Sequence, residues 1–364
     1  MNQVNVLVVD DSAFMRKMVS EMLQSHEQIH VIATARNGED GLKKMREYKP
    51  DVMTLDVEMP VMGGLTCLEQ IMHEYPIPVL MLSSVTSEGA SSTIKAMELG
   101  AVDFIQKPSG AISLDIEKIK TDIVNKVLAA ATANLQEVKP STRHEAPPIR
   151  SSLRKNVTNG GARRQKQIIA IGTSTGGPRA LQHVLSHLPD NIEAPILVVQ
   201  HMPPGFTQSL AKRLDTLCAI EVKEAEDKEI LRNGVAYIAP GDFHLQVEET
   251  ASSAKVHLHQ EPPVHGHRPS VDVLFQSVST LQHYQPTAIV MTGMGSDGAL
   301  GLRQLKAAVP TTIAIAESSQ SAVVYGMPKA CVATNLVDYE IHLKDISATL
   351  WSVMGNRRGE NTWK

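Results

Sequence analysis

The feature that most constrains this chain is an alternation of short apolar runs with longer amphipathic segments, repeated five times near its start. The runs have the length of buried strands and the segments have the length of helices. Strands that alternate with helices form a parallel sheet with helices on both faces. The predicted strands are Val4–Val9, Ile29–Ala35, Val52–Leu55, Val79–Leu82 and Val102–Ile105. The predicted helices are Ala13–Ser25, Glu39–Glu47, Leu65–Tyr75, Ser87–Leu99 and Ile112–Ala133.

The alternation stops near residue 134 and resumes at Gln167. The intervening stretch contains three prolines and many Ser, Thr and Gly residues, and between Lys139 and Lys166 Glu145 is the only acid among the basic residues. This composition is typical of an extended, solvated linker. We interpret residues 126–166 as a basic linker that acts as a charged tether; the alternative is a basic docking segment.

A second alternation predicts a second α/β domain over residues 167–355, after a first domain over residues 1–125. Its predicted strands are Ile168–Ile171, Pro195–Val199, Val235–Ala239, Ala288–Met291 and Thr312–Ala316. Its predicted helices are Arg179–His187, Phe206–Leu214, Val271–Thr280, Leu300–Ala308 and Leu343–Val353. The segments His244–Val247 and Lys255–His259 alternate in polarity like an antiparallel hairpin. We therefore predict a doubly wound domain with a mainly parallel sheet and one antiparallel hairpin.

Composition excludes several classes of protein. With 35 basic and 39 acidic residues the chain has a net charge of −4, whereas a nucleic-acid binder is usually strongly basic. The three cysteines (Cys67, Cys218, Cys331) lie far apart, which indicates a reducing compartment without a disulfide framework or zinc site. No apolar run approaches the ~18 residues of a membrane span, and the first residues do not form a secretory signal. We expect a cytoplasmic protein that does not insert into membranes.

Polar residues follow the predicted strands of the first domain, at the edge of the sheet where ligands bind in open α/β folds. Asp10 and Asp11 follow the first strand, Asp56 the third and Ser83 the fourth, and Lys107 follows the fifth. Crowded carboxylates repel one another unless a cation holds them, and oxygen ligands with open positions suit Mg²⁺. A carboxylate facing such a metal can accept a phosphoryl group, while a lysine neutralises the developing charge.

Residues 4–125 resemble a two-component receiver domain, which has a flavodoxin-like fold with a five-stranded parallel sheet. The motifs that carry the resemblance are VLVVDDS, LDVEMPVMGG, MLSS and FIQKP. The resemblance implies that Asp56 is the phosphoacceptor and that a chemotaxis histidine kinase is the phosphodonor. It implies Ser83 and Lys107 as the phosphate switch, and a Mg²⁺ ion needed for phosphorylation. The implied metal ligands are Asp10, Asp11, Asp56 and the backbone carbonyl of Glu58.

In the second domain, a Gly-rich turn carrying Ser174 follows the first strand and precedes a helix, in the sequence GTSTGGP. Small neighbours allow a sharp turn that exposes the hydroxyl, and the helix N-terminus offers amide donors to an oxyanion. The loop alone is equally compatible with a serine nucleophile and with a phosphate-binding turn.

The residues that follow two further strands favour the interpretation of Ser174 as a nucleophile. His201 follows the second strand before a Pro-Pro-Gly turn, and Asp297 lies in the Gly-rich loop after the strand Ala288–Met291. Asp297 alone would be interpreted as a helix N-cap. Because Asp297 is expected at the same edge as Ser174 and His201, we interpret the three as a catalytic triad of nucleophile, base and orienting carboxylate. Among other histidines, His257 and His259 are expected on the surface, and the loop from His265 to Ser270 is expected to contact substrate rather than metal.

Residues 168 to about 350 resemble the catalytic domain of CheB-type protein-glutamate methylesterases, through IGTSTGGP, QHMPPGFT, YIAPGDFHL, HRPSVDVLF and TGMGSDGA. The resemblance implies Ser174 as nucleophile, His201 as general base and acid, and Asp297 as the carboxylate that orients the imidazole. Backbone amides near Thr175 and Met294 would form the oxyanion hole. The family more usually has Ala or Ser at position 173 and Asn at position 296, where this chain has Thr173 and Ser296.

The resemblance also implies the reaction. The substrates would be methylated glutamates of chemoreceptors, hydrolysed with release of methanol and without a cofactor; whether glutamines are deamidated as well stays open. The position of the receiver upstream of the catalytic domain suggests control, and we hypothesise that it covers the Ser174 edge until phosphorylation of Asp56 biases it away.

Two other functions fit the sequence less well. A DNA-binding response regulator would need a compact basic output domain, whereas the output here is a long α/β pattern. A nucleotide-binding switch would need a Walker lysine or a complete dinucleotide fingerprint, and the Gly172–Gly177 loop has neither.

Overall fold

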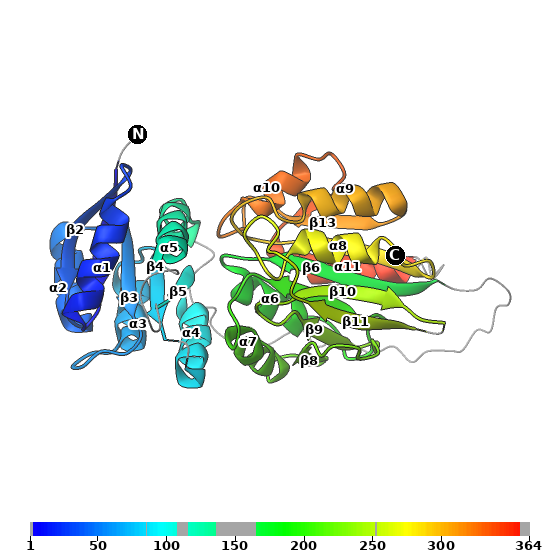
Figure 1. Cartoon of the computed structure of the whole chain (residues 1–364), viewed down its shortest axis with the longest axis horizontal. Helices are drawn as coiled ribbons and strands as arrows, with labels where there is room; N and C mark the ends of the chain where they lie inside the picture. Colours follow the sequence, from blue (N-terminus) through cyan, green and yellow to red (C-terminus); the bar gives the residue numbers. More distant parts are fainter. Residues whose placement is uncertain (1–2, 85, 108–115, 136–164, 252, 357–364) are drawn as a thin grey trace.

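The computed structural model describes residues 3–84, 86–107, 116–135, 165–251 and 253–356. It contains two domains, each built on a parallel sheet covered by helices (Figure 1). Both predicted sheets and the antiparallel hairpin are confirmed. Most of the predicted linker, residues 136–164, lies outside the described residues, as does Pro108 of the FIQKP motif.

The first domain has the strand order β2-β1-β3-β4-β5, with every neighbouring pair parallel. Its elements are β1 Val4–Val9, α1 Ala13–Gln24, β2 Ile29–Ala35, α2 Gly38–Tyr48, β3 Val52–Asp56, α3 Gly64–Glu74, β4 Val79–Ser83, α4 Ser87–Leu99, β5 Asp103–Gln106 and α5 Ile116–Ala130. Helices begin where the sequence supplies a cap: the side chains of Ser12, Asn37 and Thr86 each accept a backbone N–H three residues later.

The second domain has the strand order β14-β13-β12-β6-β7-β9-β8, again parallel throughout. Its strands are β6 Lys166–Thr173, β7 Ile196–Gln200, β8 Glu221–Glu224, β9 Val235–Ile238, β10 His244–Glu249, β11 Ala254–His259, β12 Tyr284–Val290, β13 Ile313–Glu317 and β14 Tyr339–Ile341. Its helices are α6 Gly177–Ser186, α7 Phe206–Asp215, α8 Val271–Val278, α9 Ala299–Ala308, α10 Met327–Val332 and α11 Leu343–Asn356. Strands β12, β6 and β7 are neighbours in the middle of the sheet, so the loops that follow them meet at one edge.

The structure extends the sequence analysis in two respects. Helix α5 ends at Ala130, within the predicted helix Ile112–Ala133, so residues 126–130 of the predicted linker belong to a helix whose Val127 and Ala130 are fully buried. The elements β8, α10 and β14 were not predicted. They have no apolar periodicity to predict them, since β8 and β14 lie at the two edges of the sheet and α10 spans only six residues.

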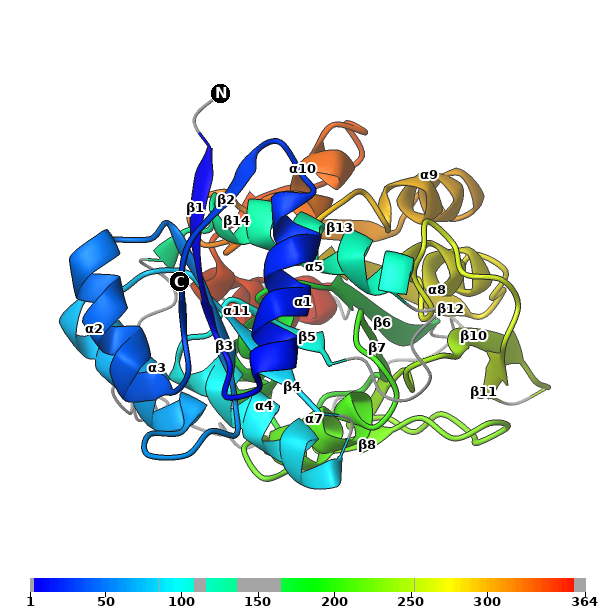
Figure 2. The same ribbon diagram turned by 60° about the vertical axis from the view of Figure 1, so that its left-hand side comes forward.

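The domains contact each other through α4 of the first and α7 and α6 of the second. The views in Figures 1 and 2 both place α4 beside α7. Across this boundary the ring of Phe104 on β5 stacks on Phe206 at the start of α7, with centroids 4.5 Å apart. Among the described residues, no helix has the length and apolar character that a membrane crossing requires.

Candidate functional site

The edge of the first sheet brings together the acidic residues that the sequence predicted. Because Val9 of β1 pairs with Leu55 of β3, Asp10 and Asp56 are the next residues of two adjacent strands. Both carboxylates are buried. Lys107 reaches over from the end of β5, and its Nζ lies 2.9 Å from Asp10 Oδ2 and 2.7 Å from Asp56 Oδ2. The predicted convergence of these three side chains is therefore present in the fold.

Burial dominates the electrostatics of this edge. It raises the pKa of Asp56 to about 6, although the Lys107 ammonium acts in the opposite direction. Burial would also lower the pKa of Lys107, but its hydrogen bonds to Asp56 and Asp10 outweigh that effect and raise it. Asp56 is thus a carboxylate held in a charged form at some cost by a neighbouring cation.

The donor set at this edge fits a hard divalent cation. Oxygen atoms of Asp10, Asp11 and Asp56 all lie within 4.8 Å of one another. Carboxylate oxygens are the ligands that Mg²⁺ prefers, and Asp11 is exposed, so water could complete the coordination. The backbone N–H of Glu58 approaches Asp56 Oδ1 at 3.4 Å, whereas its predicted role as a carbonyl ligand stays a prediction.

The Ser83 hydroxyl is engaged by helix α4 in this structure. It donates to the carbonyl of Gly89 at 3.1 Å and accepts from the Thr93 hydroxyl at 2.6 Å. The residue is completely buried at the end of β4. The proposed switch role of Ser83 would require this hydroxyl to leave α4 and approach a group on Asp56.

At the edge of the second sheet, Ser174 occupies the sharp turn between β6 and α6. Its backbone N–H donates to Thr292 at 3.0 Å, and its carbonyl accepts from Gly177 at 2.7 Å at the start of the helix. Gly293 approaches so closely that a Cβ there would come within 2.8 Å of the Ser174 Cβ. A glycine at 293 is therefore what lets the loop after β12 pass beside the serine.

His201 and Asp297 meet at the same edge. Thr173 of β6 pairs with Gln200 of β7, so Ser174 and His201 are the next residues of adjacent strands. His201 Nε2 lies 2.8 Å from Asp297 Oδ2. Because Nε2–H donates to the carboxylate, the proton-accepting nitrogen is Nδ1, which is buried and has no hydrogen-bond partner. Within the described residues the Ser174 hydroxyl makes no hydrogen bond to this ring; such contacts often tighten only when substrate binds.

Asp297 is held by four donors. Its Oδ1 accepts from the Ser270 hydroxyl and the Asp272 N–H, each at 2.9 Å, and its Oδ2 accepts from the Val271 N–H at 2.7 Å besides His201. Burial alone would raise the pKa of Asp297, but these hydrogen bonds, that from His201 first, keep it well below its ordinary value. Asp297 is therefore a fixed negative charge bonded to His201, and not a free helix cap.

Sequence reasoning missed these supporting donors, although they lie in the HRPSVDVLF motif. It also missed Gln200, whose buried side-chain amide donates to the carbonyls of Ser174 at 2.9 Å and His201 at 3.3 Å. This amide ties the ends of β6 and β7 together. The only sequence signal was the position of Gln200 directly before His201, and that position does not reveal which way the side chain points.

The amides predicted for an oxyanion hole flank the serine. Thr175 follows Ser174 in the turn, and Met294 follows Gly293, which touches the serine. In the described part of the chain, no hydrogen bond uses the backbone N–H of either residue. Both donors are thus available to a developing negative charge next to Ser174.

Comparisons with known proteins show the family of this chain. A model of the family described as CheB methylesterase matches residues 169–350, and one described as response regulator receiver domain matches residues 6–117. The chain is 54% identical to a protein-glutamate methylesterase/protein-glutamine glutaminase of Halalkalibacterium halodurans, over 96% of this chain and 98% of that protein. The chain belongs to the CheB methylesterase family.

Other relatives support the same membership. A protein of the same name from Geobacillus kaustophilus is 52% identical over 98% of this chain and 100% of that protein. The crystal structure of the Thermotoga maritima CheB methylesterase catalytic domain is similar with a TM-score of 0.50 and 41% identity, and covers 51% of this chain and 97% of that chain. The chain is accordingly a carboxylic ester hydrolase with a receiver domain ahead of its catalytic domain, as the resemblances implied.

In this family member, the receiver touches the turn that carries the serine. The Thr175 hydroxyl donates to Asp103 Oδ2 at 2.5 Å, and the Gly176 N–H donates to the Val102 carbonyl at 3.2 Å. Lys126 of α5 lies 3.8 Å from the other oxygen of Asp103, so this carboxylate is shared between the domains. The sequence did not indicate Asp103, because it looks like an ordinary residue at the start of β5.

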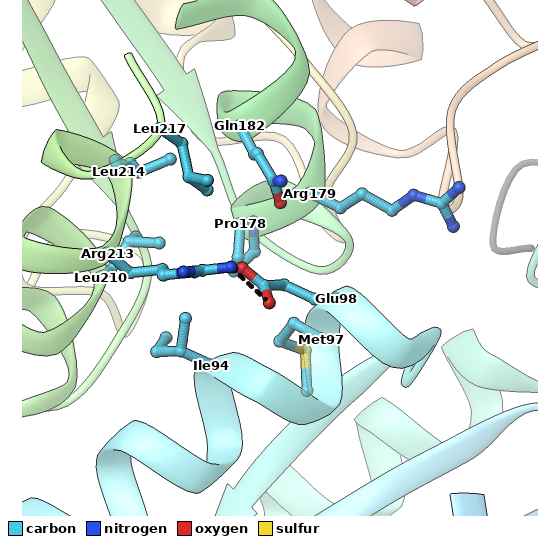
Figure 3. Close-up of a pocket in the computed structure, with 10 residues that line it drawn as sticks. All are labelled: Ile94, Met97, Glu98, Pro178, Arg179, Gln182, Leu210, Arg213, Leu214 and Leu217. Carbon is cyan, nitrogen blue, oxygen red and sulfur yellow. Dashed lines mark hydrogen bonds and ion pairs between the residues drawn. The ribbon is translucent and has the colours of Figure 1, made fainter. Parts of the chain in front are cut away.

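A pocket lies along the same boundary, between α4 and the helices α6 and α7 (Figure 3). In Figure 3, Arg213 of α7 reaches across it to Glu98 of α4. Two hydrogen bonds join them, from Nε to Oε1 at 2.5 Å and from Nη2 to Oε2 at 3.1 Å. Most of the other lining residues are apolar, among them Ile94, Leu210 and Leu217.

Proposed function

We propose that this chain hydrolyses glutamate methyl esters on chemoreceptors and that phosphorylation of Asp56 activates it. One observation carries the catalytic part: His201 and Asp297 form a buried pair at 2.8 Å at the strand edge that also holds Ser174. Family membership supplies the substrate class, since the curated relatives are named protein-glutamate methylesterases. Their second name, protein-glutamine glutaminase, extends the proposal to receptor glutamines, which the same acyl chemistry would deamidate.

The proposed reaction uses the three side chains in sequence. The Ser174 oxygen attacks the ester carbonyl while His201 Nδ1 takes its proton, and Asp297 stabilises the resulting imidazolium. The amides of Thr175 and Met294 would donate to the oxyanion. Collapse breaks the bond to the methoxy group, which leaves as methanol with the proton from His201. Water, deprotonated by the same ring, then releases the glutamate carboxylate and restores the serine.

In the receiver, Asp56 would take a phosphoryl group from a histidine kinase. Asp10, Asp11, Asp56 and the Glu58 carbonyl would hold Mg²⁺, which would neutralise the charge of the transferring group. Lys107 already bridges Asp10 and Asp56, and is placed to contact the phosphoryl oxygens. Ser83 would then exchange its contacts with α4 for one with the acyl phosphate.

We further propose that the unphosphorylated receiver restrains the esterase. Its contacts with Thr175 and Gly176 lie next to the nucleophile, and a receptor helix could not enter while β5 occupies this position. Phosphorylation would weaken the β5 and α4 contacts and favour an open arrangement. A cytoplasmic location fits this scheme and the unpatterned cysteines, and no role in nucleic-acid binding is proposed.

The decisive experiment measures methanol release from methylated receptor, with and without a small-molecule phosphodonor and Mg²⁺. We expect the phosphodonor to accelerate release, and Ser174→Ala to reduce it by about 10³-fold or more, because the covalent route is lost. Asp56 should still be phosphorylated in this variant, which serves as the control for folding. Methanol release that persists in Ser174→Ala would contradict the proposal.

A further inference from the structure

One aromatic ring at the catalytic edge has no role in the scheme above. The ring of His267 stacks on that of His201, with centroids 3.9 Å apart and an interplanar angle of 7°. The His201 side chain is only 6% exposed, so this stack covers one of its faces. The stack does not involve the two nitrogens of the His201 ring: Nε2 donates to Asp297, and Nδ1 has no hydrogen-bond partner.

The segment that carries His267 forms a tight, hydrogen-bonded turn. Val264 and His267 exchange both backbone hydrogen bonds, at 3.1 and 2.9 Å. Between them, His265 and Gly266 have φ values of 50° and 81°, the left-handed pair that a tight two-residue turn of type I′ requires. Arg268 fixes the far side of the turn, because its guanidinium bonds to Asp242.

The same segment also holds the orienting carboxylate. Three residues beyond His267, the Ser270 hydroxyl begins the set of donors to Asp297, which continues with the N–H groups of Val271 and Asp272. One stretch of chain therefore fixes both neighbours of His201, the ring on its face and the carboxylate at its edge. In the described part of the chain, no hydrogen bond uses the ring nitrogens of His267, so the stack is its link to the site.

The His267 ring is uncharged at neutral pH. Burial is the largest cause and the nearby His201 the next, and together they lower the pKa of His267 to about 4. The other charged or titratable groups that act on it are Asp297, His265 and, from helix α5 of the receiver, Lys126. A phenylalanine at this position would therefore reproduce the charge and shape of the stacked ring.

We propose that His267 is a positioning residue, whose stacked ring holds the His201 imidazole in the plane in which Nε2 meets Asp297 and Nδ1 stays free to accept the Ser174 proton. This inference rests on the proposed esterase function. In this proposal the ring acts through His201 alone. Without it, the imidazole can tilt away from the serine while keeping its bond to Asp297, and small misplacements of a catalytic group are costly.

The test compares His267→Ala with His267→Phe in the full-length, phosphorylated protein. We expect His267→Ala to lower kcat for methanol release about 10- to 100-fold with KM changed less than 3-fold. His267→Phe should restore kcat to within about 3-fold of the parent. A second readout is the rate at which a fluorophosphonate labels Ser174, which reports activation of the serine without receptor and should follow the same order.

His257→Ala is the matched control, since this half-exposed histidine on β11 lies outside the site. If His267→Ala does not fold, His267→Leu against His267→Phe makes the same comparison, because leucine fills the space without a ring. An alanine variant with the parent's kcat and labelling rate, or a phenylalanine variant as slow as alanine, would overturn the proposal. A parent protein that is labelled at Ser174 but releases no methanol would refute the proposed function alone, and the labelling rates would still decide the role of His267.

Discussion

The two sites of this protein are built on the same plan but treat their central aspartate in opposite ways. Asp56 and Asp297 are both buried at the carboxyl edge of a parallel sheet. The pKa of Asp56 is raised to about 6, mainly by burial, and Lys107 only partly compensates. The pKa of Asp297 is kept below its ordinary value, because hydrogen bonds from His201 and from backbone amides outweigh its burial.

This difference matches what each carboxylate is proposed to do. Every lone-pair direction of Asp297 is taken by a donor within the catalytic domain, so it can orient a base but cannot attack anything. Asp56 accepts one contact from Lys107 and a weak contact of 3.4 Å from the Glu58 N–H, which leaves lone pairs of its oxygens open to metal and phosphoryl group. Asp297, whose oxygens have all their hydrogen-bond donors, is suited to orienting a base. Asp56, whose oxygens keep open positions, is suited to reacting with a phosphoryl group.

The sharpest way to test this contrast is to remove each charge separately. We expect Asp297→Asn to lower esterase kcat about 10²- to 10⁴-fold, because the amide cannot stabilise the His201 imidazolium. Phosphorylation of Asp56 should be unaffected by that change. Asp56→Asn should abolish phosphoryl uptake while it leaves the basal esterase rate within about 2-fold. Methanol release and phosphoprotein gels measure the two activities, and an Asp297→Asn protein with full esterase activity would remove the contrast.

Asp297 and Asp56 should also change the pH dependence of the protein's stability in opposite directions. Because the folded pKa of Asp297 lies below its unfolded value of about 4, it contributes stability above that pH, which is lost as the pH falls. Asp56 has a folded pKa above its unfolded value, so the protein loses stability as the pH rises from about 4 to about 6. Asp297→Asn should therefore lower the free energy of unfolding by about 2–4 kcal/mol at pH 7 and by less at pH 4. Asp56→Asn should instead raise the free energy of unfolding by about 1–3 kcal/mol at pH 7.

Calorimetry in EDTA is the appropriate measurement, since a bound divalent cation would offset the cost of ionising Asp56. The two substitutions are matched controls for each other, as both replace one buried carboxylate by an amide. If both variants lose stability at pH 7 by the same amount, the two aspartates are electrostatically equivalent and the comparison fails.

The smallest expected effect concerns the ion pair between Glu98 of the first domain and Arg213 of the second. Arg213→Glu should raise the basal esterase rate about 2- to 5-fold without a phosphodonor, because an ion pair that is partly exposed contributes only about 0.2–1 kcal/mol to domain docking. Adding Glu98→Arg restores opposite charges and should return the rate to that of the parent. If the double variant stays as active as Arg213→Glu, the effect does not arise from this pair.

Much of the two sites could be predicted because their main residues directly follow strands. In a parallel sheet all carboxyl ends share one edge, so Asp10, Asp56, Ser174 and His201 had to lie close to their partners once the strands were located. The turn and side-chain details could not be predicted in this way. Ser270 and His267 approach the site from the loop between β11 and α8, which follows no strand of the parallel sheet, and their positions depend on the turn at His265 and on the contact of Arg268 with Asp242.

The sequence by itself determined the two α/β domains and the strand ends on which the reacting groups lie, because apolar periodicity and parallel topology are local and regular properties. Only the tertiary structure decided how each group is held: which donors reach Asp297, which ring covers His201, and that Asp103 of one domain touches Thr175 of the other. These contacts join residues far apart in the chain. Their distances and burial set the pKa values and the available protons, and no local pattern of residues records them.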